Sequence, residues 1–193
     1  MGWKREGFES HEGEVGVLLA DGSEPGPVYF DMGSGGYFHE STDWWVYTGQ
    51  SRRPTATTMR GRCACGWRGT RTFPIDWQEV DRNDLGAYDV SGPQADWEAH
   101  LDEVAARTVP LPEDVADLLN RLHERLDELV DDHPLTVLKA ANELESAVAL
   151  FGPLATRFLG GGEEDAVAQV AAALGMTEKA AGLRLRHYRY LTL

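Results

Sequence analysis

Cys63 and Cys65 are the only cysteines among the 193 residues of the chain, and a single alanine separates them. A disulfide between residues this close in sequence would be badly strained, so in a reducing compartment the pair is expected to be two thiols or two metal ligands. Thiolate sulfur is a preferred ligand of zinc, which takes four nitrogen or sulfur ligands in tetrahedral structural sites. The pair therefore predicts half of a structural zinc site, with two metal-free buried thiols as the alternative.

The two cysteines lie at a predicted turn between strands, in the segment Arg62-Cys-Ala-Cys-Gly-Trp-Arg-Gly69. Gly66 can adopt the backbone angles that a tight knuckle requires. Imidazole groups are expected to complete the site, and His100, near the start of a predicted helix, is the first candidate. His39, at the start of the sheet, is the second, and it is preferred to His11 because the N-terminal segment is expected to be mobile.

This segment resembles the CxCGWRG motif, followed downstream by Trp and His, that occurs in some uncharacterised small bacterial proteins. The residues that carry the resemblance are Cys63, Cys65, Gly66, Trp67, Arg68, Gly69, Trp97 and His100. It implies a metal-binding module and supplies no activity.

The first half of the chain has the pattern of short strands separated by Gly and Asp turns. The predicted strands are residues 15–20, 28–30, 44–47, 55–63 and 66–73. An antiparallel sheet with a zinc-knuckle-like turn is the expected outcome. The composition changes near residues 90–93, and helical periodicity dominates beyond them. We therefore predict an α+β protein with a β module over residues 1–92 and a helical region over residues 93–193.

Two amphipathic stripes predict a helical hairpin over residues 112–159. Pro112 followed by Glu113 and Asp114 suits a first helical turn. The first stripe is Val115, Leu119, Leu122, Leu126 and Leu129, and the second is Val137, Ala141, Leu144, Val148 and Phe151. The stripes can pack on each other within one chain, or they can form the seam of a homodimer or the contact with a protein partner.

The last segment, residues 163–190, has a helix that ends in Leu174-Gly175, a short turn and a second helix capped by Thr177. It resembles the helix-turn-helix of bacterial regulators and the promoter-reading region of sigma factors, which implies DNA binding. On this resemblance the two helices pack through Val167, Val170, Ala171, Leu174, Ala181 and Leu185. The exposed face of the second helix then carries Thr177, Glu178, Lys179, Gly182, Arg186 and Arg189. The alternative is a helical pair that only closes the core.

The charge of the chain is unevenly distributed along the sequence. A net charge of −14 argues against nonspecific binding of nucleic acids, because an acidic surface repels their phosphates. Residues 44–75, however, contain six arginines and no Asp or Glu. A second basic cluster closes the chain. The residues predicted to contact double-stranded DNA are Thr177, Lys179, Arg186, Arg189, Arg68 and Arg71.

These patterns favour a DNA-binding or DNA-associated transcriptional regulator with a structural zinc ion. The alternative is an interaction adaptor that uses the acidic helical hairpin to bind a basic partner or a second copy. No pattern of catalytic residues is present, so the chain is not expected to be an enzyme. No signal peptide or membrane-spanning stretch is evident, so a cytoplasmic location without membrane contact is expected.

Overall fold

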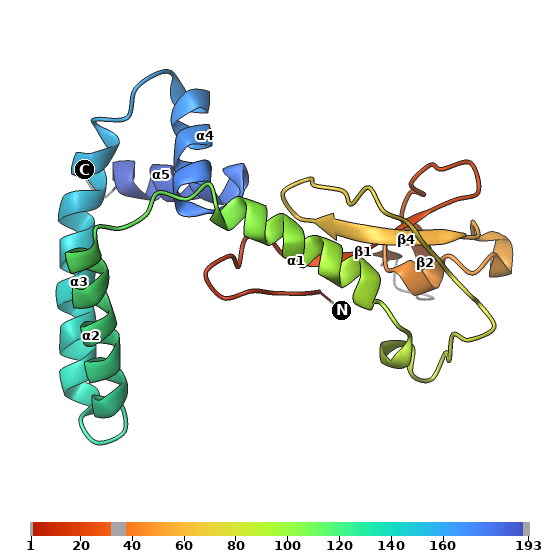
Figure 1. The fold of residues 1–193 in the computed structure, drawn as a ribbon, viewed down its shortest axis with the longest axis horizontal. Coiled ribbons are helices and arrows are strands. Elements are labelled where there is room, and N and C mark those ends of the chain that lie inside the picture. The colour runs from red at the N-terminus through yellow and green to blue at the C-terminus, as the bar shows by residue number, and fades with distance from the viewer. Residues whose placement is uncertain (1, 32–37, 191–193) are drawn as a thin grey trace. The chain divides into compact units, whose positions relative to one another are not determined.

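The computed structural model describes residues 2–31 and 38–190, and the chain divides into two compact units, Met1–Ala106 and Arg107–Leu193. The N-terminal unit contains the strands and helix α1, and the C-terminal unit contains helices α2 to α5 (Figure 1). The predicted α+β class is confirmed, including the N-terminal antiparallel sheet, the helical hairpin and the C-terminal helical pair. Among the described residues, no helix combines the length and apolar character needed to cross a bilayer.

The main sheet is built on the antiparallel pair of β1 (Gly13–Leu18) and β4 (Thr58–Cys63). In its register Gly13 lies opposite Cys63 and Leu18 lies opposite Thr58. Strand β4 alternates between half-buried and buried side chains, as expected when one face of a strand packs on a core. The short strand β5 (Phe73–Pro74) pairs with the first residues of β4. The register thus brings the start of β1 beside the cysteine end of β4.

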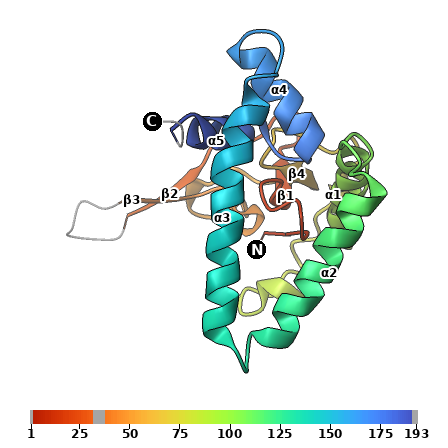
Figure 2. The same ribbon diagram turned by 90° about the vertical axis from the view of Figure 1, so that its left-hand side faces the viewer.

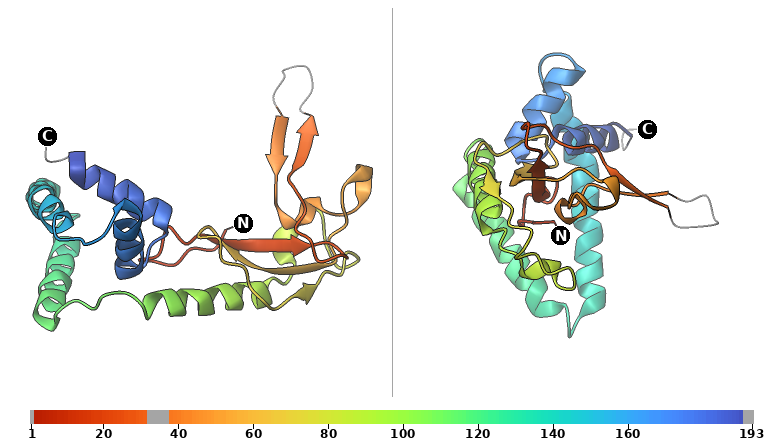
Figure 3. Two further views of the ribbon diagram at one scale, coloured as in Figure 1. Left: turned by 90° about the horizontal axis from the view of Figure 1, so that it is seen from above. Right: turned by 90° about the vertical axis from the view of Figure 1, so that its right-hand side faces the viewer.

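Strands β2 (Val28–Asp31) and β3 (Phe38–Ser41) form a separate two-stranded ribbon, visible in Figure 3. The predicted strand at residues 44–47 is wrong. Trp44–Val46 forms a 3-10 helix, in which the Tyr47 N–H donates to the carbonyl of Trp44. This turn buries Trp44, Val46 and Tyr47 together, whereas a strand would send alternate side chains to opposite faces.

The predicted strand at residues 66–73 is largely wrong as well. Within this range the structure shows only an isolated bridge between Arg62 and Arg68 and the first residue of β5. The remaining residues turn back tightly after the cysteines, so they cannot continue the ladder.

Helix α1 (Ser91–Ala105) packs across β1 and β4 (Figures 1 and 3). Glycines on both strands allow this close approach, because a Cβ on Gly13 would lie 2.5 Å from the indole of Trp97 and one on Gly61 would lie 2.5 Å from the carbonyl oxygen of Pro93. Trp97 and Leu101 are consequently buried. The helix belongs to the N-terminal unit, so the predicted seam between residues 92 and 93 lies one helix too early.

In the C-terminal unit, α2 (Glu113–Leu129) and α3 (Pro134–Thr156) form the antiparallel hairpin, which Figure 2 shows with its turn at one end. Pro134 occupies the start of α3, where a missing N–H costs no helical hydrogen bond. No residue of α2 is buried, and Pro153 is the one buried residue of α3.

Helices α4 (Glu163–Leu174) and α5 (Glu178–Tyr190) complete the C-terminal unit. Gly175 ends α4 with a left-handed φ of 61°, a conformation that favours glycine. The hydroxyl of Thr177 accepts the N–H of Ala180 at 3.3 Å and thereby caps α5. Ala181, Gly182 and Leu185 are buried, so the prediction that Gly182 lies on the exposed face is wrong.

Candidate metal centre

The two cysteines lie on a knuckle that begins at the last residue of β4. The Gly66 N–H donates to the carbonyl of Cys63 at 2.9 Å, and the Cys63 N–H donates to the carbonyl of Trp67 at 3.0 Å. Gly66 has a φ of 96°, which lets the chain reverse at this point. The Trp67 N–H points to Cys65 Sγ at 3.4 Å. The backbone thus orients both sulfur atoms toward one point and supports the second with a donor.

His11 reaches the knuckle from the segment just before β1. Its side chain is 4% exposed, and its Nδ1 lies 3.6 Å from Cys63 Sγ. Its carbonyl accepts the indole N–H of Trp97 at 3.0 Å, and the Ala64 N–H donates to the next carbonyl, that of Glu12, at 2.9 Å. These bonds fix the N-terminal segment against both the knuckle and α1.

His100 approaches from α1, one helical turn after the buried Trp97. Its Nε2 lies 3.4 Å from Cys65 Sγ. Its ring stacks on the indole of Trp67, with centroids 4.5 Å apart and an angle of 9° between the planes. The stacking holds the imidazole in one orientation, so the ring nitrogen stays directed at the cysteines.

The four side chains form one group of potential metal ligands, with every ligand atom within 4.8 Å of the others. For zinc–sulfur distances of about 2.3 Å and zinc–nitrogen distances of about 2.0 Å, a tetrahedron separates neighbouring ligands by roughly 3.5 Å. The two sulfur-to-nitrogen distances, 3.6 Å and 3.4 Å, match that value. His11, Cys63, Cys65 and His100 can therefore hold a metal ion with little rearrangement.

The cluster leaves one buried nitrogen without a partner and perturbs both thiols. His11 Nε2 is buried and has no hydrogen-bond partner among the described residues, which costs free energy. It is not the ring nitrogen that lies near Cys63 Sγ, so an ion bound through Nδ1 would leave it without a partner. The hydrogen bond from Cys63 lowers the pKa of Cys65 to about 4. The same contact, together with burial, raises the pKa of Cys63. A metal ion that binds both sulfurs binds them as thiolates, so metal binding is linked to loss of the thiol protons.

The predicted ligands are brought together in three cases out of four. Cys63, Cys65 and His100 belong to the cluster, whereas His39 does not. His39 is exposed on β3 opposite Phe30. His11 occupies the position in the cluster that was predicted for His39. The antiparallel register explains the exchange, because it sets Gly13 opposite Cys63 and so brings the residues just before β1 to the knuckle.

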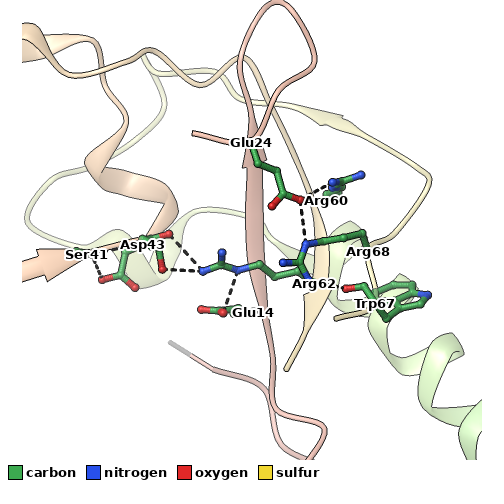
Figure 4. A network of polar contacts seen from close by, with 9 residues as sticks. Glu14, Glu24, Ser41, Asp43, Arg60, Arg62, Trp67 and Arg68 are labelled. Carbon is green, nitrogen blue, oxygen red and sulfur yellow. Dashed lines mark hydrogen bonds and ion pairs between the residues drawn. The ribbon is translucent and has the colours of Figure 1, made fainter. Parts of the chain in front are cut away.

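The arginine-rich stretch of the N-terminal unit does not form an unpaired basic surface. Glu24 accepts hydrogen bonds from Arg60 and from Arg68, the latter at 2.9 Å, and Arg62 pairs with Glu14 at 2.9 Å (Figure 4).

Arg71 pairs with Asp96. Carboxylates from distant parts of the sequence therefore occupy Arg68 and Arg71, the two residues of this stretch that were predicted to contact DNA.

The other predicted DNA-contacting residues lie on or beside α5. Lys179 and Arg186 are exposed. Arg189 is exposed as well, and it pairs with Glu163 at 3.0 Å. Thr177 caps the helix.

Comparison of the chain with protein-family models, with curated proteins and with solved structures found no match.

Proposed function

We propose that the chain is a DNA-binding regulator whose N-terminal unit is stabilised by a zinc ion. The metal part of the proposal is supported by the donor set, two sulfurs and two imidazoles at tetrahedral spacing. Such a combination is typical of structural zinc. Four protein ligands leave no open coordination position for a substrate, so the ion has a structural role.

The DNA-binding part is supported by α5, which buries a face of small and apolar residues and exposes its basic residues, with Leu183 exposed among them. Ala181, Gly182 and Leu185 are buried against the rest of the unit, while Lys179, Arg184 and Arg186 are exposed. Glu178 is the one acidic residue of this helix. A capped helix with a buried small-residue face and an exposed basic face suits the major groove of DNA, where positive side chains neutralise phosphates.

The helix junction also supports this role. Helix α4 ends at Gly175, which has a left-handed backbone conformation, and only Met176 and Thr177 lie between Gly175 and α5. Ala171 and Ala181 are buried, at 8% and 0% exposure. Alanines at a crossing let two helices approach closely, which is the arrangement that a helix-turn-helix uses to present its second helix.

The test is the salt dependence of binding to random-sequence duplex DNA, measured by fluorescence anisotropy. Replacing Lys179 and Arg186 together with alanine should weaken binding and reduce the slope of log K against log salt by about two. The matched control replaces Arg121 and Lys139, two exposed basic residues of the hairpin, and changes the net charge equally. Equal loss in both variants, or binding that does not respond to salt, would contradict a role for α5.

An adaptor role is the second candidate, and the hairpin supplies the observation that favours it. Helix α2 carries six acidic residues against Arg121 and Arg125, and none of its side chains is buried. A surface of this kind suits contact with another protein. Self-association of the chain that persists at high salt and disappears when Leu122 and Leu126 are made polar would support the adaptor over the DNA-binding role.

A further inference from the structure

The C-terminal unit leaves an unusual number of large apolar side chains exposed. Those on the hairpin are Val115, Leu118, Leu119, Leu135, Leu138, Leu144, Val148, Leu150, Phe151 and Leu154. Helix α3 is apolar around most of its circumference, with Lys139, Glu143 and Glu145 as its charged residues, and such a helix is normally buried. Two helices alone cannot bury it.

The line along which α2 and α3 meet is itself open on one side. We call Val115, Leu119, Leu144, Val148 and Phe151 the seam, since they continue the two apolar stripes of the hairpin. These side chains remain 37%, 39%, 41%, 47% and 63% exposed. Residues that point toward a partner helix and still keep this exposure need a further element to cover them.

The seam runs into an apolar groove of about 490 Å³ within the same unit. The groove shares Val148 and Phe151 with the seam and is closed on its other side by Leu174, Leu185 and Tyr188. Seam and groove thus make one continuous apolar surface.

A surface with this composition requires an apolar partner, and the chain itself offers one candidate. Among the described residues of the N-terminal unit, Tyr29 is the one large apolar side chain with high exposure, so that unit has no matching surface. The seam can instead match the seam of a second copy. The charged residues of α2 lie opposite its apolar stripe, so pairing two seams does not bury like charges.

The apolar area of the seam and its borders can be compared with the needs of a dimer. The five seam side chains leave roughly 230 Å² of apolar surface, taking roughly 100 Å² for each fully exposed side chain. Leu118 and Leu154, which flank the seam, and Leu174 of the groove raise this to roughly 370 Å². This value is within the range of the largest apolar patches on monomers, which are often functional, and it is most of the apolar part of an interface that covers about 800 Å² on each partner.

We propose that the chain is a homodimer in which the seams of two copies meet and the two hairpins form a four-helix bundle. The proposal goes beyond DNA and zinc binding, because the seam contains no residue of the metal cluster or of α5. In a dimer, two copies of α5 are present in one particle.

The test is sedimentation equilibrium of the full zinc-loaded chain at micromolar concentrations. The wild type should sediment as a dimer, and Leu144→Glu with Val148→Glu should give a monomer of unchanged helical circular dichroism. Leu183→Glu, which puts the same charge on an exposed apolar site of α5, should stay dimeric.

A milder variant guards against unfolding of the double replacement. Val148→Ala removes apolar contact from both copies at once and should raise the dimer dissociation constant at least about tenfold. A second measurement, amide hydrogen exchange, should show protection of α2 and α3 that increases with protein concentration. A monomeric wild type, or a dimer that survives both seam variants, would overturn the proposal.

Discussion

Replacing His11 with alanine should remove the metal site, whereas replacing His39 should leave it intact. His11 is 4% exposed, with Nδ1 3.6 Å from Cys63 Sγ. His39 is exposed on β3 and outside the cluster. The two variants remove the same side chain from the same unit, and the two sites differ chiefly in contact with the cysteines and in burial.

The expected size of the effect follows from ligand linkage. A metal present at about 1,000 times its dissociation constant stabilises the folded state by about 4 kcal/mol. In a domain of about 100 residues, 1 kcal/mol shifts the unfolding midpoint by roughly 4–8 °C. Zinc should therefore raise the midpoint of the N-terminal unit by roughly 16 °C or more, and His11→Ala should lose most of this increase.

Tryptophan fluorescence reports this transition selectively, because all six tryptophans of the chain lie in the N-terminal unit. Each variant is melted with zinc and with a chelator, and its zinc content is measured by elemental analysis. The midpoint measured with the chelator shows how much stability His11→Ala loses through packing alone. The difference between the zinc and chelator midpoints then reports the contribution of the metal. We expect about one zinc per chain in the wild type and in His39→Ala.

Two results would contradict a metal-binding role of His11. One is a zinc-dependent shift that His11→Ala retains in full. The other is a wild type without bound metal whose midpoint does not respond to the chelator, which would leave the four side chains as a metal-free cluster.

Three further predictions concern stability. Gly13→Ala should destabilise the N-terminal unit by about 1–3 kcal/mol in urea unfolding followed by fluorescence, because the new methyl group would meet the indole of Trp97. Gly16→Ala on the same strand should cost less, since its neighbour is the flexible side chain of Arg62. Glu24→Gln should destabilise by at most about 1 kcal/mol at neutral pH. Gly182→Ala should stabilise the C-terminal unit by about 0.5–1 kcal/mol by circular dichroism, because the new Cβ would lie 3.8 Å or more from its neighbours.

The Glu24 prediction has a defined pH dependence. Burial would raise the pKa of Glu24, but the hydrogen bonds and charges of Arg60 and Arg68 outweigh it, so this pKa lies below the ordinary value of 4.5. A lowered pKa in the folded state stabilises the protein above the unfolded value, and this stabilisation is lost as the pH falls through the folded value. The difference between wild type and Glu24→Gln should therefore shrink below pH 4.5, and a difference independent of pH would count against the ion pairs.

The sequence carried enough information for three members of the candidate metal cluster, because their signals are local. A Cys-x-Cys pair followed by glycine predicts a knuckle, and the segment that contains His100 predicts a helix start that can present an imidazole to it. His11 was missed because its position depends on the register of β1 with β4, which pairs residues 40 to 50 positions apart in the sequence. A signal for it was present, since it lies just before a strongly apolar strand.

The ion pairs of the arginine-rich stretch were missed for the same reason, because they join residues that are distant in the sequence. Residues 44–75 lack acids, which suggested an unpaired basic surface, yet the partners of Arg68 and Arg71 are Glu24 and Asp96, 44 and 25 residues away. Pairing across such separations depends on the tertiary fold and leaves no local pattern. The helices of the C-terminal unit were predicted well because their 3.6-residue periodicity is local.

The sequence spacing of the four clustered side chains has a consequence for the order of folding. The cluster joins residues 52 and 35 apart in the sequence, so it cannot assemble until His100 has left the ribosome, when nearly all of the N-terminal unit has been synthesised. Contacts of this range form slowly, whereas the hairpin of α2 and α3 depends on neighbours and forms quickly. The half of the protein that is made first is therefore expected to finish folding last, and zinc supply during synthesis should influence how much of the chain reaches its native state.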